Sequence, residues 1–183
     1  SEVTPFSVVT DDDGHKQPIF SYRMTPDMAI IDSSFTDHLP KTLVAHAGLD
    51  AITHAVETYT AVDANDFTMP HALRSLSLLF ANLEKSYKVG DKVSRERVHH
   101  GASIAGLAFS NSYLGVCHSL SHKVGAVFHL PHGLVNSILL PYVMESNAVP
   151  NPTRMGVYPS YGRPQTLERY AKLTRTVNCH GTT

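Results

Sequence analysis

The chain has 183 residues, of which 42% are hydrophobic, and its formal net charge at pH 7 is −1. Such a chain can bury one sizeable core, and it has no basic surplus that would attract nucleic acid. No stretch reaches the roughly 18 apolar residues of a membrane helix, and the two cysteines indicate no disulfide framework, so we expect a cytoplasmic protein without nucleic-acid or membrane partners.

Residues 1–35 favour extended structure. The β-branched and aromatic residues of segment 2–10 predict a strand, the acidic run 11–14 predicts a turn, and segment 17–22 can return as a second strand. Residues 28–32 predict a third strand. The acidic run lacks the later oxygen ligands of a calcium loop, so we interpret it as a turn and not as a cation site.

The pattern becomes helical after Pro40. Apolar residues recur at helical spacing in residues 42–59 and 66–87. Residues 94–128 contain no proline and many small residues, which suits close packing of helices, but the segment is too long for one ordinary helix, so we expect a break near residues 110–112. The remainder comprises an apolar segment with an internal proline, a loop rich in Pro and Gly, and an amphipathic helix: residues 135–144, 149–164 and 165–177.

Histidine is the unusual residue of this composition, because the 12 histidines nearly equal the 15 lysines and arginines together. Two pairs of possible metal ligands are spaced four residues apart, Asp50 with His54 and His118 with His122. Residues at this spacing project from one face of a helix, about one turn apart along its axis, so each pair can present two ligands to one point. His132, between a proline and a glycine, lies in a segment that we expect to be a loop able to fold a further ligand back.

The chemistry of this set is that of a metal site. Asp50 lies among small and apolar residues, where an unpaired carboxylate would be costly. One carboxylate with several imidazoles suits a divalent transition metal. On the residues alone, a metal site and ordinary buried histidines with hydrogen-bond partners are both open.

Two other possible ligand sets fit less well. Glu96 and His99 match half of a di-iron motif, but that motif needs a second copy, which the sequence does not contain. We interpret these two residues as the solvated start of a helix. Cys117 would point away from His118 on a helix, so we expect it to be a buried small residue and not a fourth ligand.

Several runs of this chain resemble the iron-dependent (group III) alcohol dehydrogenases. The matching runs are residues 48–57, 106–111, 115–125 and 131–133, and three of them carry the candidate ligands described above. Other segments are similar to the alcohol dehydrogenase half of the bifunctional aldehyde-alcohol dehydrogenases: residues 1–6, 25–30, 95–99 and 161–165. The similarity covers nearly all of the chain as far as residue 177.

The resemblance implies roles for particular residues. The metal, iron(II) (Fe2+) with Zn2+ able to replace it in an isolated preparation, would be held by Asp50, His54, His118 and His132. His122 would lie beside the metal and take part in proton movement. Cofactor-binding residues would be Thr4, Lys16 and Phe109, of which Phe109 borders the nicotinamide and substrate pocket in relatives; an ordinary core position is the alternative for Phe109.

The resemblance also implies a fold. We expect a mainly α structure in which residues 36–183 form a helical metal-binding domain, truncated at its C-terminal end. Residues 1–35 would be the last strands of an incomplete N-terminal α/β dinucleotide-binding domain. The sequence has no glycine-rich phosphate loop, and it begins without Met, so we expect it to be part of a longer protein.

The implied activity is reversible hydride transfer between NAD(H) and a short-chain alcohol or aldehyde, such as ethanol and acetaldehyde, in a homo-oligomer that can be filamentous. Neither the preferred alcohol nor the choice between NAD and NADP follows from the sequence. Two alternatives remain open. A metal-dependent hydrolase could activate water at the same ion, and the chain could be a non-catalytic helical assembly module of a larger protein.

Overall fold

A computed structural model describes residues 2–14, 16–150 and 165–178 of the chain. These residues form six α-helices, one two-stranded sheet and two short 3₁₀ helices. The elements are β1 (Phe6–Thr10), β2 (Lys16–Phe20), η1 (Tyr22–Met24), η2 (Ser33–Thr36), α1 (Lys41–Thr60), α2 (Met69–Lys88), α3 (Lys92–Phe109), α4 (Val116–Phe128), α5 (His132–Asn147) and α6 (Thr166–Asn178).

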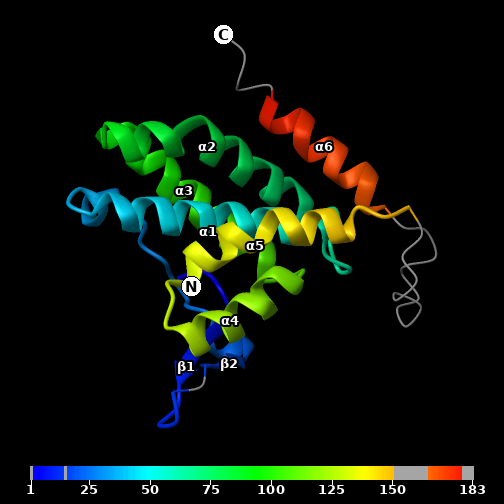
Figure 1. The fold of residues 1–183 in the computed structure, drawn as a ribbon. Coiled ribbons are helices and arrows are strands. Elements are labelled where there is room, and N and C mark those ends of the chain that lie inside the picture. The colour runs from blue at the N-terminus through cyan, green and yellow to red at the C-terminus, as the bar shows by residue number, and fades with distance from the viewer. Residues whose placement is uncertain (1, 15, 151–164, 179–183) are drawn as a thin grey trace.

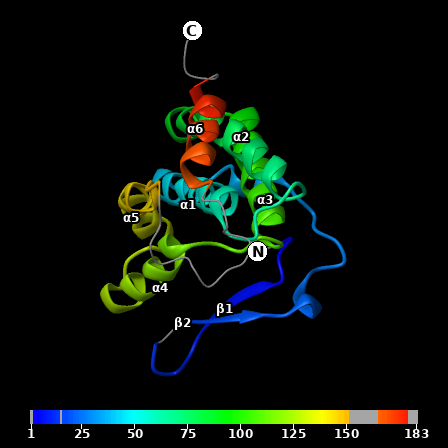
Figure 2. The same cartoon turned by 90° about the vertical axis from the view of Figure 1, so that its right-hand side faces the viewer.

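Helix α1 is the centre of the helical part (Figures 1 and 2), where it contacts α2, α3, α5 and α6. Helix α4 packs on α5 and approaches β2, so the hairpin lies on the opposite side of the molecule from α6. The mainly α fold expected from the sequence is confirmed. Because α1 contacts most of the other helices, it can bring its own polar side chains close to residues far along the chain.

The core lies between α1, α2, α3 and α6. Ala105 and Ala108 of α3 are fully buried, so the small residues of this segment permit close helix packing, as predicted. The buried residues of the core cluster are Ala51, Ile52, Ala55, Val56, Tyr59, Ala72, Leu76, Leu79, Ala105, Ala108 and Leu173.

The predicted hairpin is present. Strands β1 and β2 pair antiparallel, with Phe6 opposite Phe20. The Phe6 ring anchors the hairpin on the helical part, because its centroid lies 5.8 Å from that of Phe109 and 5.9 Å from that of Tyr113. The prediction of a third strand over residues 28–32 is wrong. This segment has no regular structure and is largely exposed, and without a partner strand its backbone groups could not form a sheet ladder.

The helix boundaries agree well with the sequence pattern. The predicted break in the long small-residue segment separates α3 from α4, with Tyr113 in a left-handed conformation (φ 61°). Pro141 lies inside α5, which continues through it. Of the predicted loop over residues 149–164, positions 151–164 lie outside the described residues, and the expected C-terminal helix is α6.

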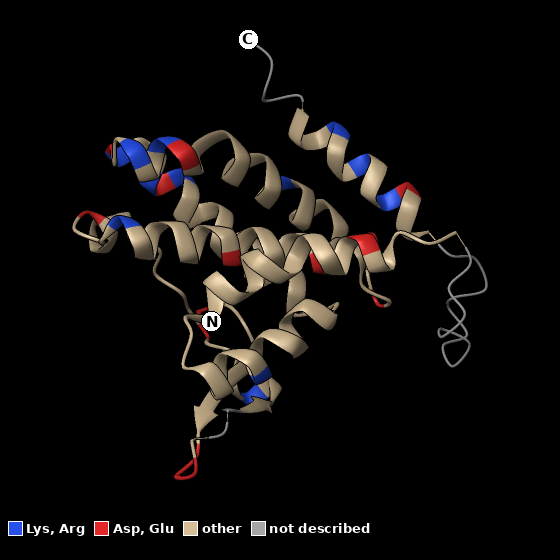
Figure 3. Ribbon diagram, viewed as in Figure 1, with Lys and Arg blue, Asp and Glu red and all other residues tan. Residues whose placement is uncertain are grey.

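Charged residues are unevenly distributed (Figure 3). They gather where α2 ends and α3 begins, and along α6, whereas α1 carries few of them in its central turns. Within the described residues, no helix is both long enough and apolar enough to cross a bilayer. The buried Glu57 and the half-buried Asp50 of α1 therefore stand apart from the charged surface of the molecule.

Candidate metal centre

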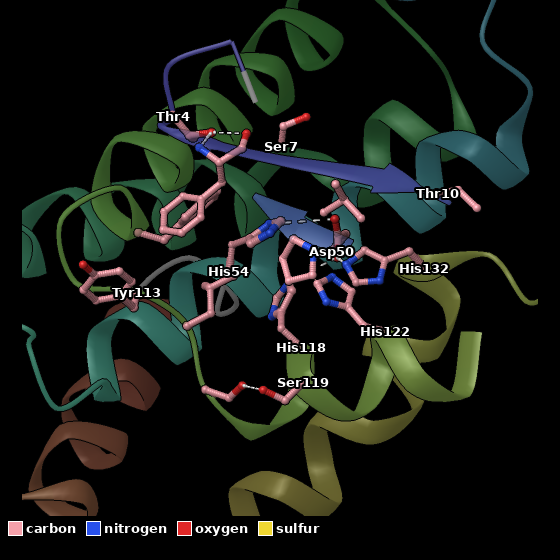
Figure 4. Close-up of a pocket in the computed structure, with 16 residues that line it drawn as sticks. Thr4, Ser7, Thr10, Asp50, His54, Tyr113, His118, Ser119, His122 and His132 are labelled. Carbon is pink, nitrogen blue, oxygen red and sulfur yellow. Dashed lines mark hydrogen bonds and ion pairs between the residues drawn. The ribbon is translucent and has the colours of Figure 1, made fainter. Parts of the chain in front are cut away.

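A cavity of about 580 Å³ lies between the hairpin, α1, the end of α3 and the first turns of α4 and α5. Figure 4 shows imidazoles from three helices directed toward the Asp50 carboxylate, with β1 passing over them. The carboxylate and imidazoles that line the cavity are those of Asp50, His54, His118, His122 and His132. The two pairs and the single histidine found in the sequence therefore reach one place.

Helix α1 supplies the first pair. His54 Nδ1 lies 3.8 Å from Asp50 Oδ2, one helical turn away. The His54 ring stacks on Phe109, with 4.7 Å between the centroids, and on His118, with 4.4 Å between the centroids. Burial lowers the pKa of His54 to about 3, against the attraction of Asp50. His54 is therefore a neutral imidazole, which is the form that binds a metal.

Helix α4 supplies His118, which is only 4% exposed. Its Nε2 lies 3.7 Å from Asp50 Oδ1, and its Nδ1 lies 2.5 Å from Glu57 Oε2. Burial lowers the pKa of His118, but the two carboxylates favour the charged imidazolium more strongly, so the net effect is a raised pKa. Without a metal ion, the carboxylates of Asp50 and Glu57 thus favour binding of a second proton by the His118 ring.

His132 is the first residue of α5, and the expected loop at this position is wrong. Pro131 precedes the helix, and a proline here fits because the first backbone N–H groups of a helix have no intrahelical partner. A Cβ at Gly133 would overlap the His46 carbonyl oxygen of α1, so glycine allows α5 to begin close to α1. As a result, His132 Nε2 lies 3.6 Å from Asp50 Oδ1.

One ligand atom from each of Asp50, His54 and His118 lies within 4.8 Å of the other two, as in a group that can hold a metal ion. His132 joins this group through its approach to Asp50. Burial raises the pKa of Asp50. The hydrogen bonds with His118 and Asn136 and the attraction of the neighbouring imidazoles lower it by more, so the pKa of Asp50 lies well below its usual range. The carboxylate is therefore ionised at neutral pH.

His122 lies one turn beyond His118 on α4, at the side of the group. Its ring centroid is 4.9 Å from that of His132 and 6.5 Å from that of His118. It also lines the cavity. This position beside the candidate ligands is compatible with the predicted part in proton movement, which stays a prediction.

The three predicted cofactor-binding residues differ in what the structure says of them. Phe109 lines the cavity and stacks on His54. Thr4 also lines the cavity and is 2% exposed. The side chain of Lys16 lies outside the described part of the chain. The roles of all three toward a cofactor remain predictions.

Two polar residues of the site were not singled out from the sequence. Glu57 is 5% exposed and accepts hydrogen bonds from the first turn of α4, and Asn136 is fully buried and donates to Asp50 Oδ1 at 2.6 Å. Helical spacing was the available signal. Glu57 lies two turns beyond Asp50, and Asn136 lies one turn beyond His132.

Cys117 and His99 were not taken as metal ligands in the sequence, and the structure confirms the prediction for Cys117 but only part of that for His99. Cys117 is fully buried, as predicted, and its Sγ lies 3.6 Å from Asn136 Oδ1. Burial and the neighbouring carboxylates raise the pKa of Cys117 to about 12, so it remains a thiol. The prediction for His99 is wrong in part. The helix does begin at Lys92, but His99 is half-buried, and its Nδ1 is buried without a hydrogen-bond partner among the described residues.

Comparison with known protein families identifies the family of this chain. Residues 44–183 match the model of the C-terminal part of the Fe-containing alcohol dehydrogenase family. The match covers most of the chain, so the chain belongs to the Fe-containing alcohol dehydrogenase family. This confirms the resemblance found in the sequence and identifies the helical part as the family's C-terminal domain.

Particular relatives are similar over nearly the whole chain. The chain is 52% identical over 176 residues to the bifunctional aldehyde-alcohol dehydrogenase of Escherichia coli K12, covering 94% of this chain and 20% of that protein. It is 43% identical to the NADPH-dependent butanol dehydrogenase of Clostridium saccharobutylicum, covering 100% of this chain and 43% of that protein. The chain therefore spans less than half the length of these relatives.

Solved structures agree with this assignment. The iron-containing alcohol dehydrogenase of Thermococcus thioreducens superposes with a TM-score of 0.83 at 36% identity, over 97% of this chain and 43% of that chain. A 1,3-propanediol oxidoreductase superposes with a TM-score of 0.80 at 32% identity, over 98% of this chain and 49% of that chain. The arrangement of helices around the cavity is thus shared with enzymes of the family.

Proposed function

We propose that this chain is the metal-bearing domain of an alcohol dehydrogenase that transfers hydride reversibly between NAD(H) and a short-chain alcohol or aldehyde, such as ethanol and acetaldehyde. The observation that carries the proposal is the convergence of Asp50, His54 and His118, whose ligand atoms lie within 4.8 Å of one another in a cavity. The family relationship supports the choice of reaction. NAD is proposed here although one relative is named as NADPH-dependent.

The donor set suits a divalent ion. We propose Asp50, His54, His118 and His132 as its ligands, because one ionised carboxylate and three imidazoles leave a divalent cation with a net positive charge. Iron(II) is proposed from the family, whereas ligand affinity ranks zinc above iron, so Zn2+ can occupy the same residues in a preparation. The low pKa of His54 supports this set, because a neutral ring has its lone pair available.

In the proposed reaction, the metal ion and the nicotinamide supply part of the chemistry and the side chains of this chain supply the rest. A divalent ion at these residues supplies Lewis-acid chemistry toward a substrate oxygen, and a nicotinamide supplies the redox chemistry. The chain orients the substrate in the cavity, where Phe109 and Tyr113 offer aromatic surface beside the imidazoles. We propose that His122 moves the proton that the alcohol oxygen gains or loses, because its ring lies beside His132 at the side of the ligand group.

Contacts with the cofactor are proposed for residues of the hairpin side. Thr4 and Phe109 line the cavity next to the candidate ligands, and Lys16 is added from the family resemblance alone. We also propose that residues 1–35 belong to the dinucleotide-binding domain and residues 36–183 to the metal-binding domain. The position of the hairpin over the cavity, opposite the helical part, supports this division. A homo-oligomer, filamentous or not, is also proposed from the resemblance.

The substitution His118→Ala in the full-length protein that carries this chain tests the proposal. We expect loss of bound metal and loss of NADH oxidation with acetaldehyde, because His118 is a buried imidazole whose Nε2 faces the Asp50 carboxylate. Metal content and the decrease in NADH absorbance measure the two effects. The control His71→Ala removes an exposed histidine of α2 and should leave both unchanged. Unaltered metal content and turnover in His118→Ala would contradict the proposal, and hydrolysis of an ester without NADH oxidation would favour a hydrolase.

A further inference from the structure

Glu57 makes an unusual set of contacts for a buried carboxylate. Its Oε1 accepts a hydrogen bond from Cys117 N at 2.7 Å, and its Oε2 accepts one from His118 N at 3.3 Å. The Oε2 atom also lies 2.5 Å from His118 Nδ1. All three contacts are to the first turn of α4, although Glu57 belongs to α1. Burying a carboxylate is costly unless it is paired and hydrogen-bonded, and these contacts provide the partners.

The local backbone is built to admit this carboxylate. A Cβ at Gly115 would lie 2.6 Å from Glu57 Oε1, so a larger residue would push the carboxylate away from the helix end. The first N–H groups of α4 have no intrahelical acceptor, and the N-terminus of a helix carries a partial positive charge. Glu57 therefore caps α4 and fixes its first turn, which carries His118, against α1, which carries Asp50 and His54.

We propose that Glu57 is a positioning residue of the metal centre, which holds the neutral His118 ring with its proton on Nδ1 so that Nε2 presents a lone pair to the ion. This proposal rests on the metal centre proposed above. Glu57 would not contact the ion itself; it would act through His118, which is one of the proposed ligands. The chemistry required is only a hydrogen bond from the ring to the carboxylate.

The contact with Glu57 assigns the tautomer of a neutral His118 ring, and the Asn136 contact is compatible with it. An ionised carboxylate oxygen can only accept a hydrogen bond, so the Nδ1 atom next to Glu57 is the donor. On the other side of the ring, Asn136 Nδ2 lies 3.1 Å from His118 Nε2. The orientation of this amide is fixed because Nδ2 also donates to Asp50 Oδ1 at 2.6 Å. A neutral ring carries one N–H group, so with the proton on Nδ1 the lone pair is on Nε2, which faces Asp50.

The consequence for metal binding follows from the ring orientation. A carboxylate that accepts the second N–H of a ligating histidine restricts rotation of the ring and makes the ligating nitrogen more basic. Loss of such a partner lowers metal affinity by about 10–100-fold. Glu57 makes this contact while it is 5% exposed, so water does not replace it readily.

The substitution Glu57→Gln in the full-length protein tests this role. Glutamine fits the same space, but its amide NH2 must face one of the N–H donors that the carboxylate now accepts. We expect Zn2+ affinity, measured by competition with a chelator, to fall by about 10–100-fold while the far-ultraviolet circular dichroism is unchanged. In ¹⁵N spectra of the metal-free protein, recorded at a pH at which the His118 ring is neutral, His118 should change from the Nδ1–H tautomer to a mixture of both tautomers.

A control separates positioning from general stability. Ser75 is fully buried, and its Oγ donates to Gly101 O at 2.7 Å in the contact between α2 and α3, away from the cavity. The substitution Ser75→Ala removes a buried hydrogen bond without altering the site, so Zn2+ affinity should stay at the value of the unsubstituted protein. A fall in Zn2+ affinity for Ser75→Ala as large as that for Glu57→Gln would overturn the proposal.

Two results for Glu57 itself would also overturn the proposal. One is equal Zn2+ affinity of Glu57→Gln and the unsubstituted protein. The other is a ¹⁵N spectrum of the unsubstituted, metal-free protein in which neutral His118 carries its proton on Nε2. The second measurement needs no variant, so it decides the matter even if Glu57→Gln does not fold. If the unsubstituted protein binds no Zn2+, the proposed metal centre fails, whereas the tautomer still reports separately on Glu57.

Discussion

The buried Asn136 side chain contacts three of the four candidate ligands. Its Nδ2 lies 2.6 Å from Asp50 Oδ1, 3.1 Å from His118 Nε2 and 3.1 Å from His132 Nε2. Its Oδ1 lies 3.6 Å from Cys117 Sγ, which can act as a weak donor. The amide therefore keeps the carboxylate and two imidazoles of the site together, and a buried thiol supports its orientation.

The substitution Asn136→Leu should weaken both metal binding and the metal-free fold. Leucine is similar in size but cannot donate to Asp50, so we expect a loss of about 1–3 kcal/mol in the free energy of unfolding and a lower Zn2+ affinity. Urea unfolding and chelator competition measure the two. The matched control Asn82→Leu lies on α2, where Asn82 donates only to the Leu78 carbonyl in the contacts described. Equal Zn2+ affinity for the two variants would refute this role of Asn136.

At the residue scale, helical spacing predicted groups that share one helix, and the family resemblance predicted the ligand set across helices. Glu57 and Asn136, which support that set from other helices, were missed. The spacing of four residues predicted that Asp50 and His54 lie on one face, and the structure agrees. Glu57 meets a partner 61 residues away, and Asn136 meets one 86 residues away. Such contacts depend on the packing of α1 against α4 and α5, which no periodicity within one element specifies.

At the scale of elements, local signals predicted most helices, and the errors arose where tertiary contacts decide. The break between α3 and α4 was predicted from the length of the segment and its Ser-Asn-Ser sequence. Residues 28–32 have suitable strand residues but no partner strand, so they remain irregular. The start of α5 at His132 depends on the close approach to α1 that Gly133 permits, and this approach could not be foreseen from local propensity.

The N-terminus of α3 gives a prediction about pH. Asp91 caps the helix, accepting hydrogen bonds from Ser94 N at 3.2 Å and from Ser94 Oγ at 2.8 Å, and these bonds hold the pKa of Asp91 below its usual value. A carboxyl group with a lowered folded-state pKa stabilises the fold above its unfolded-state pKa of about 3.9, and this contribution is lost as the pH falls through the folded-state pKa.

The substitution Asp91→Asn should therefore make the thermal stability of the protein less dependent on pH in the acidic range. Asparagine can still cap the helix, but it cannot titrate or attract Lys85, whose Nζ lies 3.3 Å from Asp91 Oδ2. We expect the unsubstituted protein to have the higher Tm near pH 7, and the two Tm values to converge below about pH 4. Thermal unfolding over a pH series measures this difference. A difference in Tm that is the same at all pH values would show that the Asp91 charge does not contribute.

At the scale of the whole molecule, the candidate site depends on parts of the chain that no single element contains. Residues from the N-terminal hairpin, α1, the link between α3 and α4, and the start of α5 all line the same cavity. The sequence predicted the mainly α fold through its resemblance to a family, and the family model and solved structures confirm it. The shape of the cavity required the packing of the hairpin through Phe6 against α3, which the sequence alone did not predict.

In the proposed metal centre, side chains from three helices share one cation. The most direct measurement is an anomalous difference map from crystals of the full-length protein loaded with Zn2+, with data collected above the zinc absorption edge. We predict a single strong peak within coordination distance of Asp50, His54, His118 and His132. A map without a peak among these residues, or with the ion bound by other side chains, would contradict the account.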